Sequence, residues 1–268
     1  MKKDYDINDL YNAYKSLKIK KNDIIYITGN LLSLGRYENR NILNDNFNVL
    51  KNIIGKKGTI AFPTHSFELV SSKRVFDIKN TYSETGSFTE FLRKKKNSVR
   101  QNHPYSSTTA IGKYAKFICT NNTQHVYGPN SPFQRLIDLN AKFIGFGMSP
   151  GLTATQVHHA EFMMDVPYRF IKTFKQRSKI NKKIVTKEFY LFVLHKNLIA
   201  LRRDRNKKIF RYFVKKNKIL RKKLGKSYIY SYSFSKFYKS TIELMQKDIY
   251  CWLTSEARTK FQKSKLRE

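Results

Sequence analysis

Apolar residues recur in the first two-thirds of the chain with a helical period in some segments and as short runs in others. Residues 7–17 keep a helical period, and the apolar run at residues 24–27 predicts a buried strand. A second helix is predicted over residues 42–54, and another strand over residues 59–62. Helices that alternate with strands favour parallel pairing, with helices on the faces of the sheet.

The next segments continue this alternation. A short helix is predicted between Gly86 and Lys95. Ser131, followed by proline and then by Gln134, indicates a helix start with a serine cap, a proline in the first turn and a capping box. We interpret Ser131 as that cap alone. Residues 143–147 then predict a strand that leads into a glycine-containing loop.

The last third is predicted to be different in kind. Residues 170–174 and 189–194 indicate strands of an antiparallel sheet, residues 227–234 one more strand, and residues 237–245 a closing helix. We therefore expect a single α/β domain over residues 1–268. It has a central, mostly parallel sheet flanked by helices, with additional antiparallel strands in the C-terminal third.

Composition fits such a domain. The chain has 268 residues, of which 40% are hydrophobic and 14% aromatic, enough for a sizeable core. No apolar run has the length of a signal peptide or of a membrane span, so we expect a cytoplasmic protein. The two cysteines, Cys119 and Cys251, lack the spacing of a zinc site or a disulfide framework and are interpreted as buried apolar residues.

Candidate chemistry follows the glycine-containing loop, where Thr155, His158 and Glu161 recur every third residue. On a helix these side chains share a face. A hydroxyl, an imidazole and a carboxylate that can orient it are the groups that general-base acyl transfer needs. His159 competes for the role of the base, and a buried structural histidine is the other interpretation. A metal site is not expected, because the carboxylate-bridged metal bundles that contain His-x-x-Glu also need further glutamates.

Three loops follow predicted strand ends, at residues 28–35, 64–66 and 148–155. Ligands bind at the carboxyl ends of the strands in open α/β sheets. We expect these loops to converge on one cleft.

The order of short motifs along the chain resembles the aminoglycoside 3-N-acetyltransferase family, whose members transfer an acetyl group from acetyl-coenzyme A to an amino sugar. The matching pieces are residues 23–35, residues 58–64, residues 76–77 followed by 81–86, Glu90 and Arg93, residues 100–107 with Gly112, residues 127–128 with 131–133, and the Thr155/His158/Glu161 segment. The resemblance implies that His158 is the base, that Glu161 orients the imidazole or binds the substrate ammonium, and that Thr155 donates a hydrogen bond near the thioester.

The resemblance also implies ligand contacts. Backbone amides of the loop Leu31, Leu32, Ser33 and Leu34 would face the pantetheine arm. Arg100, His103, Ser106 and Ser107 would bind the phosphates or the pantetheine amides, although a polar turn set by Pro104 explains that segment equally well. Thr64 and His65 are candidates for the acceptor pocket.

The chain departs from the family at residues 28–30. It has Thr-Gly-Asn there, where the family usually has His-Ser-Ser. The family's side-chain roles are therefore not carried over to those positions, and a changed acceptor is one interpretation. His125 and His195 have no motif context and are interpreted as structural or exposed.

The net charge of +34 changes the choice of acceptor. One interpretation of this excess charge is that the composition simply favours lysine on solvated faces. The other is that the protein binds polyanionic partners. Coenzyme A is one such partner, and a nucleotide- or glycan-linked biosynthetic amino sugar fits this charge better than a polycationic aminoglycoside.

Alternatives remain open at this point. One is an acyltransferase that uses a hydroxyl acceptor or another acyl-coenzyme A. The other is a basic polyanion-binding protein that contacts an anionic surface through the basic C-terminal third, at residues 172–187 and 202–226. The sequence has no signature of specific nucleic-acid binding.

Overall fold

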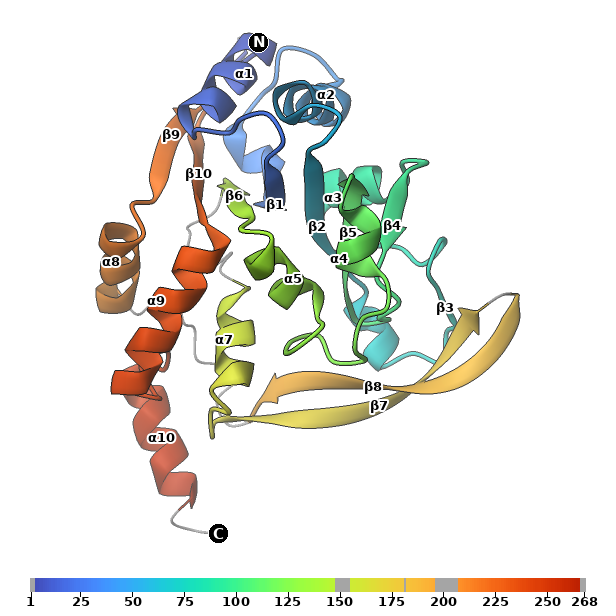
Figure 1. Cartoon of the computed structure of the whole chain (residues 1–268), viewed down its shortest axis with the longest axis vertical. Coiled ribbons are helices and arrows are strands. Elements are labelled where there is room, and N and C mark those ends of the chain that lie inside the picture. Colours follow the sequence, from blue (N-terminus) through green and yellow to red (C-terminus); the bar gives the residue numbers. More distant parts are fainter. Residues whose placement is uncertain (1–2, 148–154, 181, 196–206, 266–268) are drawn as a thin grey trace.

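A seven-stranded mixed sheet forms the centre of the protein (Figure 1), in the order β4-β5-β2-β1-β6-β10-β9. The computed structural model describes residues 3–147, 155–180, 182–195 and 207–265. The strands are β1 (Ile24–Gly29), β2 (Thr59–His65), β4 (Ser98–Arg100), β5 (Ser106–Gly112), β6 (Lys142–Phe146), β9 (Leu220–Leu224) and β10 (Ser227–Ser233). Strands β2, β1 and β6 pair in parallel, and the outer neighbours pair antiparallel. The α/β fold class is thus confirmed, with parallel pairing confined to the three central strands.

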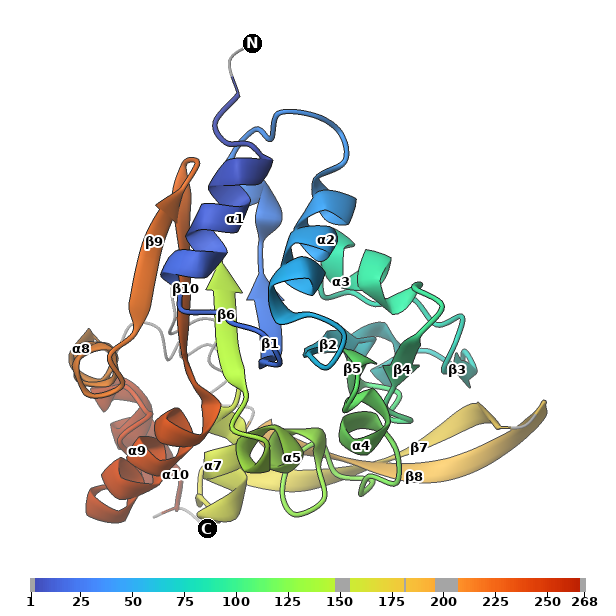
Figure 2. The ribbon, with the colours of Figure 1, turned by 45° about the horizontal axis from the view of Figure 1, so that its top comes forward.

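Helices cover both faces of this sheet (Figure 2). One layer consists of α1 (Ile7–Ser16), α2 (Ile42–Ile54) and α3 (Ser87–Arg93), and the other of α4 (Ala115–Cys119), α5 (Pro132–Asp138), α7 (Val157–Met163) and α9 (Phe234–Lys247). Strand β1 shows why both layers form. Ile25 and Ile27 pack with α1 and α2, whereas Tyr26 points to the other face against Phe133 and Phe234. Alternate residues of a strand face opposite sides, so a strand that is apolar throughout needs both layers.

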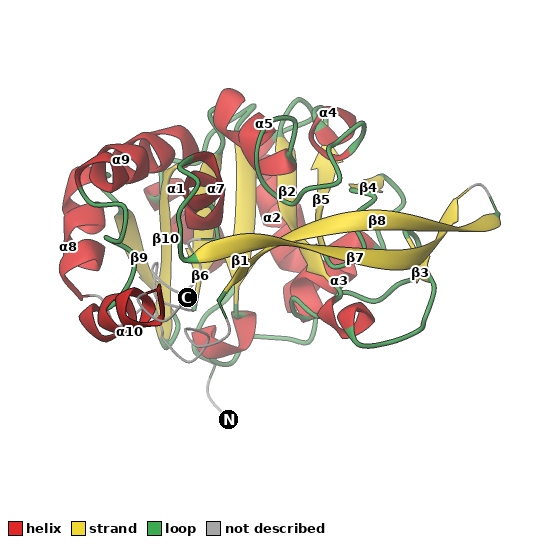
Figure 3. Ribbon diagram, turned by 90° about the horizontal axis from the view of Figure 1, so that it is seen from below, coloured by secondary structure: helices red, strands yellow, loops and turns green. Residues whose placement is uncertain are grey.

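A second, three-stranded sheet contains a long hairpin. It consists of β3 (Phe76–Asp77), β7 (Arg169–Ile180) and β8 (Lys183–Leu194), with β7 and β8 antiparallel. In Figure 3 the hairpin crosses in front of the strands of the large sheet. A small apolar core with Tyr105 and Phe189 anchors it to the rest of the protein. The expected antiparallel strands are therefore present and longer than the sequence pattern indicated.

The C-terminal third completes the layer around α9. Helices α8 (Lys207–Lys216) and α10 (Ser255–Lys265) flank it. Phe213 on α8 packs between Phe237 and Trp252, with ring centroids 4.7 Å and 5.0 Å away. Among the described helices, none has the length and apolar character that crossing a membrane requires.

Most predicted elements are confirmed, with two kinds of correction. The sequence pattern missed the strands β3, β4, β5 and β9 and the helices α4, α8 and α10. Ser131 caps α5, because its hydroxyl accepts a hydrogen bond from the backbone of Gln134 at 3.2 Å. The expected capping box is wrong in its second half, since the Gln134 amide donates to Asp138 at 2.8 Å.

Candidate active site

Helix α7 brings the side chains of His158 and Glu161 together. Nδ1 of His158 lies 2.7 Å from Oε2 of Glu161. The Glu161 side chain is fully buried and that of His158 is 26% exposed, so the imidazole lies at the surface end of the pair. With Glu161 ionised, Nδ1 of His158 carries the ring hydrogen and Nε2 has the lone pair. Thr155 precedes the helix, and its carbonyl accepts the backbone N–H of His158 at 3.0 Å.

Tyr168 and Arg169, which follow α7 in the sequence, contact the buried carboxylate of Glu161. The Tyr168 hydroxyl donates to Oε1 of Glu161 at 3.1 Å, and Nε of Arg169 lies 2.8 Å from Oε2. NH1 of Arg169 donates in turn to the carbonyl of Phe192 on β8 at 3.3 Å. Sequence reasoning missed both residues, because only the fold returns the start of β7 to α7. The one signal available was an arginine shortly after a candidate catalytic glutamate, which is common in any sequence.

His159 has a different environment from its neighbour. Its Nδ1 accepts a hydrogen bond from the Gly128 N–H at 3.2 Å, and its Nε2 lies 3.1 Å from the Gln134 side-chain oxygen. An acceptor at Nδ1 puts the ring hydrogen on Nε2. His159 is fully buried, and burial lowers its pKa to about 4. Both of its ring nitrogens are used within the protein, and His158 is the histidine that faces Glu161.

An aromatic side chain borders the exposed imidazole. The Tyr127 ring lies 5.8 Å from the His158 ring, between their centroids, and is itself packed against Phe133. Tyr127 is buried, so it forms a fixed wall beside His158. This wall limits the directions from which a substrate can approach the imidazole.

The predicted donor loop is a short 3₁₀ helix, η1 (Leu31–Leu34). Its four residues divide into two groups. Leu31 and Leu32 line a hollow of about 650 Å³, and Leu32 is 83% exposed. Leu34 is fully buried, and the Ser33 hydroxyl donates to the Asn30 carbonyl at 2.6 Å. Only the first two side chains are therefore available to a ligand in this hollow.

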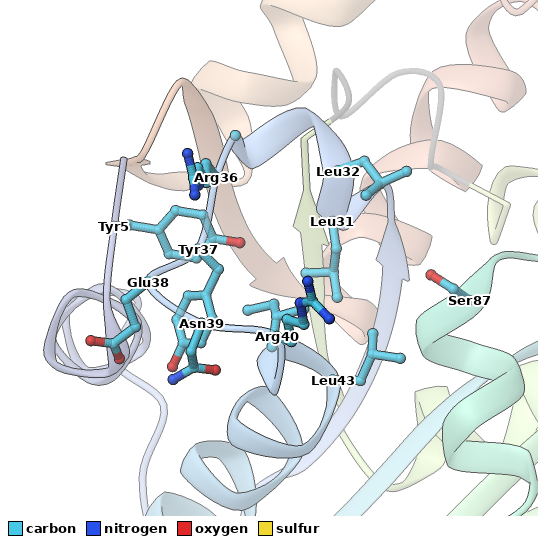
Figure 4. A pocket seen from close by; sticks show the side chains of 12 residues that line it. Tyr5, Leu31, Leu32, Arg36, Tyr37, Glu38, Asn39, Arg40, Leu43 and Ser87 are labelled. Atoms are coloured by element: carbon cyan, nitrogen blue, oxygen red, sulfur yellow. The ribbon is translucent and has the colours of Figure 1, made fainter. Parts of the chain in front are cut away.

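The segment between η1 and α2 brings two arginines to the same hollow. Arg36 and Arg40 line it together with Tyr37, and Ser87 of α3 lies across from them (Figure 4). Both arginines are exposed. Guanidinium groups suit phosphate oxygens. Sequence reasoning did not single out these residues, because exposed arginines in a chain with 53 basic residues carry little information by themselves.

Asn30 belongs to the Thr28-Gly29-Asn30 segment, where the sequence differs from the usual family triplet, and it has a structural contact there. Its side-chain oxygen accepts a hydrogen bond from the Leu32 N–H at 3.0 Å and so caps η1. Gly29 comes directly before, and a Cβ there would lie 2.1 Å from the Phe146 carbonyl oxygen. A smaller hollow of about 250 Å³ adjoins this turn and shares Leu31 and Ser87 with the larger one. The turn thus separates two adjoining hollows.

Arg100 is not near either hollow, although the sequence predicted a donor contact for it. Its guanidinium donates to the Ser107 hydroxyl at 2.9 Å, to the Thr81 carbonyl at 2.6 Å, and to the Thr64 carbonyl and Ser66 hydroxyl at 2.7 and 3.0 Å. Arg100 is buried, and burial lowers its pKa to about 10, so it stays charged at neutral pH. The guanidinium of Arg100 is thus used in contacts within the protein, and its predicted donor contact stays a prediction.

Its neighbours belong to the same buried region. His103 is 1% exposed; its Nδ1 accepts the Ser106 N–H at 3.2 Å, and burial lowers its pKa to about 3. The Ser107 hydroxyl is fully buried against the Thr64 carbonyl, at 2.7 Å. Nδ1 of His103 and the Ser107 hydroxyl are therefore used in contacts within the protein, and the predicted donor contacts of these residues stay predictions.

The two predicted acceptor residues differ in exposure. Thr64 is fully buried, and its hydroxyl pairs with those of Ser107 and Thr109 at 3.0 and 2.7 Å. His65 is partly exposed, and its Nδ1 lies 3.1 Å from the Ser106 hydroxyl. Only His65 has surface to offer a substrate. Of the three loops expected to converge, residues 148–154 of the third lie outside the described residues.

Comparison with known proteins relates the chain to aminoglycoside 3-N-acetyltransferases. A model of the aminoglycoside 3-N-acetyltransferase family matches residues 27–246. The chain is 29% identical over 114 residues to aminoglycoside N(3)-acetyltransferase IX of Micromonospora chalcea, which covers 42% of this chain. The match spans only 40% of the length of that relative.

Two solved structures share the fold. AAC-VIa bound to sisomicin has a TM-score of 0.79 and 19% identity, covering 91% of this chain and 98% of that one. The binary complex of AAC-IIIb with CoASH has a TM-score of 0.78 and 20% identity, covering 90% of this chain and 96% of that one.

Proposed function

The chain belongs to the aminoglycoside 3-N-acetyltransferase family, and from this premise we propose that it transfers the acetyl group of acetyl-coenzyme A to the amine of an amino sugar. The observation that carries the proposal is the contact between His158 and Glu161, with Nδ1 and Oε2 2.7 Å apart on α7. A partly exposed imidazole backed by a buried carboxylate is the arrangement that a general base needs.

The proposed chemistry assigns a role to each member of the motif. An amine is mostly protonated at neutral pH, so it must lose a proton before its nitrogen attacks the thioester carbonyl. Nε2 of His158 accepts that proton while Nδ1 donates to Glu161. The C–N bond forms, the carbonyl oxygen becomes an oxyanion near Thr155, and the C–S bond then breaks. The nitrogen loses its second proton as the amide forms, the leaving thiolate takes up a proton to give free thiol, and His158 releases its proton to solvent.

For the donor we propose the hollow lined by Leu31, Leu32, Arg36 and Arg40. Its volume of about 650 Å³ suits an extended ligand, and its wall is apolar near η1 and contains two arginines and Glu38 beyond it. Coenzyme A has an uncharged pantetheine arm that would lie along η1 and phosphates that would face the arginines. This replaces the predicted phosphate contacts of Arg100 and His103.

The acceptor is proposed only as an amino sugar. The net charge of +34 favours an anionic, nucleotide- or glycan-linked sugar over a polycation. The comparisons do not support that narrower choice, because the relatives are named for aminoglycosides. A hydroxyl acceptor remains the second candidate, motivated by Thr28, Gly29 and Asn30 in place of the usual family triplet.

The test is thiol release from acetyl-coenzyme A against a panel of aminoglycosides and nucleotide-linked amino sugars, with His158→Gln as the matched variant. Release that needs both an amine and His158 supports the proposal, and the active member of the panel identifies the acceptor class. Mass spectrometry and NMR of the product distinguish an amide from an ester. Lack of turnover with every amine, together with lack of coenzyme A binding in calorimetry, overturns it.

A further inference from the structure

We infer that Arg169 is a positioning residue that sets the protonation of the His158–Glu161 pair, so that the imidazole is a neutral base at neutral pH. The inference rests on the proposed function for the role of His158. Its first test does not depend on turnover.

The geometry places two basic side chains on one carboxylate oxygen. Oε2 of Glu161 lies 2.7 Å from Nδ1 of His158 and 2.8 Å from Nε of Arg169. The other oxygen, Oε1, accepts the Tyr168 hydroxyl at 3.1 Å. One negative charge thus faces a permanently charged guanidinium and a titratable imidazole, inside the protein.

The positive charge of Arg169 affects how readily His158 loses its proton. A buried carboxylate that faces only an imidazole stabilises the imidazolium strongly, because loss of that proton leaves an uncompensated buried anion. With Arg169 in contact, the anion stays compensated when His158 loses its proton. Arg169 therefore lowers the pKa of the pair relative to an isolated His–Glu pair, and His158 can accept a proton from substrate.

The described groups that face the pair from neighbouring elements are uncharged, unlike Arg169. The Tyr127 ring faces His158 from the segment before α5, at 5.8 Å. His159 on α7 itself points to Gly128 and Gln134. The Tyr250 ring packs on Tyr168 at 6.2 Å. These groups are neutral at pH 7, whereas Arg169 is a fixed cation in contact with Glu161.

The hairpin holds Arg169 in this position. Its NH1 donates to the Phe192 carbonyl at 3.3 Å, and the Phe192 ring packs edge-on against Phe162 of α7 at 5.3 Å. The Arg169 side chain is 9% exposed. A lysine at this position keeps the charge but cannot make both contacts with the geometry of a guanidinium.

The first experiment is an NMR titration of the imidazoles in histidine-labelled protein, with His158→Gln used to assign the His158 signal among six histidines. In Arg169→Gln we expect the His158 midpoint to rise by about one pH unit or more. Arg169→Lys should return it toward the wild-type value. The signal of buried His159, read from the same spectra, serves as the control for an intact fold. An unchanged or lower midpoint in a folded Arg169→Gln protein overturns the inference.

A second variant decides the matter if Arg169→Gln does not fold. Glu161→Gln removes the anion and leaves the guanidinium beside the imidazole. We then expect the His158 midpoint to fall below the ordinary histidine value of about 6.5, because like charges repel. A midpoint at or above that value means that Arg169 does not act on His158.

The pH profile of kcat/KM separates positioning from a merely structural role. Positioning moves the acid limb of the Arg169→Gln profile to higher pH by the same amount as the titration. A structural role lowers the rate equally at every pH and leaves the limb in place, which counts against the inference. Absence of thiol release in the wild-type protein would count against the proposed function alone, since the titration still decides the role of Arg169.

Discussion

The backbone N–H of Gly128 donates a hydrogen bond to Nδ1 of His159 at 3.2 Å, whereas the adjacent His158 directs its own Nδ1 to Glu161. Two consecutive histidines therefore have separate tasks. One is fixed in the packing between α7 and α5, and the other lies at the partly exposed end of its pair with Glu161.

This division predicts opposite effects for one substitution at two neighbouring positions. His158→Gln should lower the rate of thiol release by roughly a hundredfold or more, the usual contribution of a general base, with little change in stability. His159→Gln should lower the free energy of unfolding by about 1–3 kcal/mol, since it disturbs two buried hydrogen bonds, with a near-normal rate per folded molecule. Steady-state rates and urea denaturation on both variants check this; a catalytic loss confined to His159→Gln contradicts it.

Stability should fall in acid because the pKa of several histidines is lowered in the folded protein, and His103 and His159 are the least exposed of them. Burial lowers the pKa of His103 to about 3 and that of His159 to about 4, from an ordinary value of 6.5. Above pH 6.5 both are neutral in the folded and unfolded chain. Below it the unfolded chain binds protons that the folded protein does not, so the free energy of unfolding decreases toward pH 4. Urea denaturation across this range measures the slope, and His159→Gln should make it shallower.

The sequence predicted the fold where apolar spacing carries the signal. The helical period of apolar residues was sufficient to predict α1, and the apolar run was sufficient to predict β1. Strand β5 was missed because its Ser106–Gly112 segment is buried but begins with four polar residues. That strand is stabilised by hydroxyl pairs with β2, such as Thr64 with Thr109 at 2.7 Å, which no local pattern indicates.

In the candidate site, too, the sequence predicted local contacts but not those that depend on the fold. His158 and Glu161 lie one helical turn apart, so local geometry was enough to predict their contact. Arg169 reaches Glu161 only through the turn into β7, and Arg100 is enclosed only because β5 pairs with β2 and β4. Contacts that depend on sheet topology could not be read from spacing.

Two leucines of η1 offer a matched comparison. Leu34→Ala should lower the free energy of unfolding by about 2–5 kcal/mol, because the side chain is fully buried. Leu32→Ala should leave stability unchanged, since Leu32 is 83% exposed, and should weaken coenzyme A binding through lost apolar contact. Thermal unfolding and calorimetry with coenzyme A test both. Normal coenzyme A affinity in Leu32→Ala argues against the hollow as the donor site.

Arg100→Gln should act on stability. Four acceptors surround the Arg100 guanidinium, and glutamine cannot reach them all, so we expect a loss of about 3 kcal/mol or more. Coenzyme A affinity of the protein that remains folded should be close to normal. Denaturation and calorimetry on the same preparation provide both values. A stable variant with lost affinity would restore the phosphate contact that the sequence suggested.

Arg36 and Arg40 give the complementary prediction, because both are exposed on the hollow. Replacing both by glutamine should weaken coenzyme A binding by about tenfold or more, or about 1.4 kcal/mol, with unfolding unchanged. The loss should shrink as salt is added, since screening weakens the contact in the wild-type protein.

The control is the double variant Lys236→Gln and Lys239→Gln on α9, across the sheet. It removes the same charge and should leave coenzyme A binding intact. Pantetheine, which has no phosphate, should bind the arginine variant and the wild type equally. If the lysine control loses as much affinity, the contribution comes from the overall charge of +34 and not from a phosphate site.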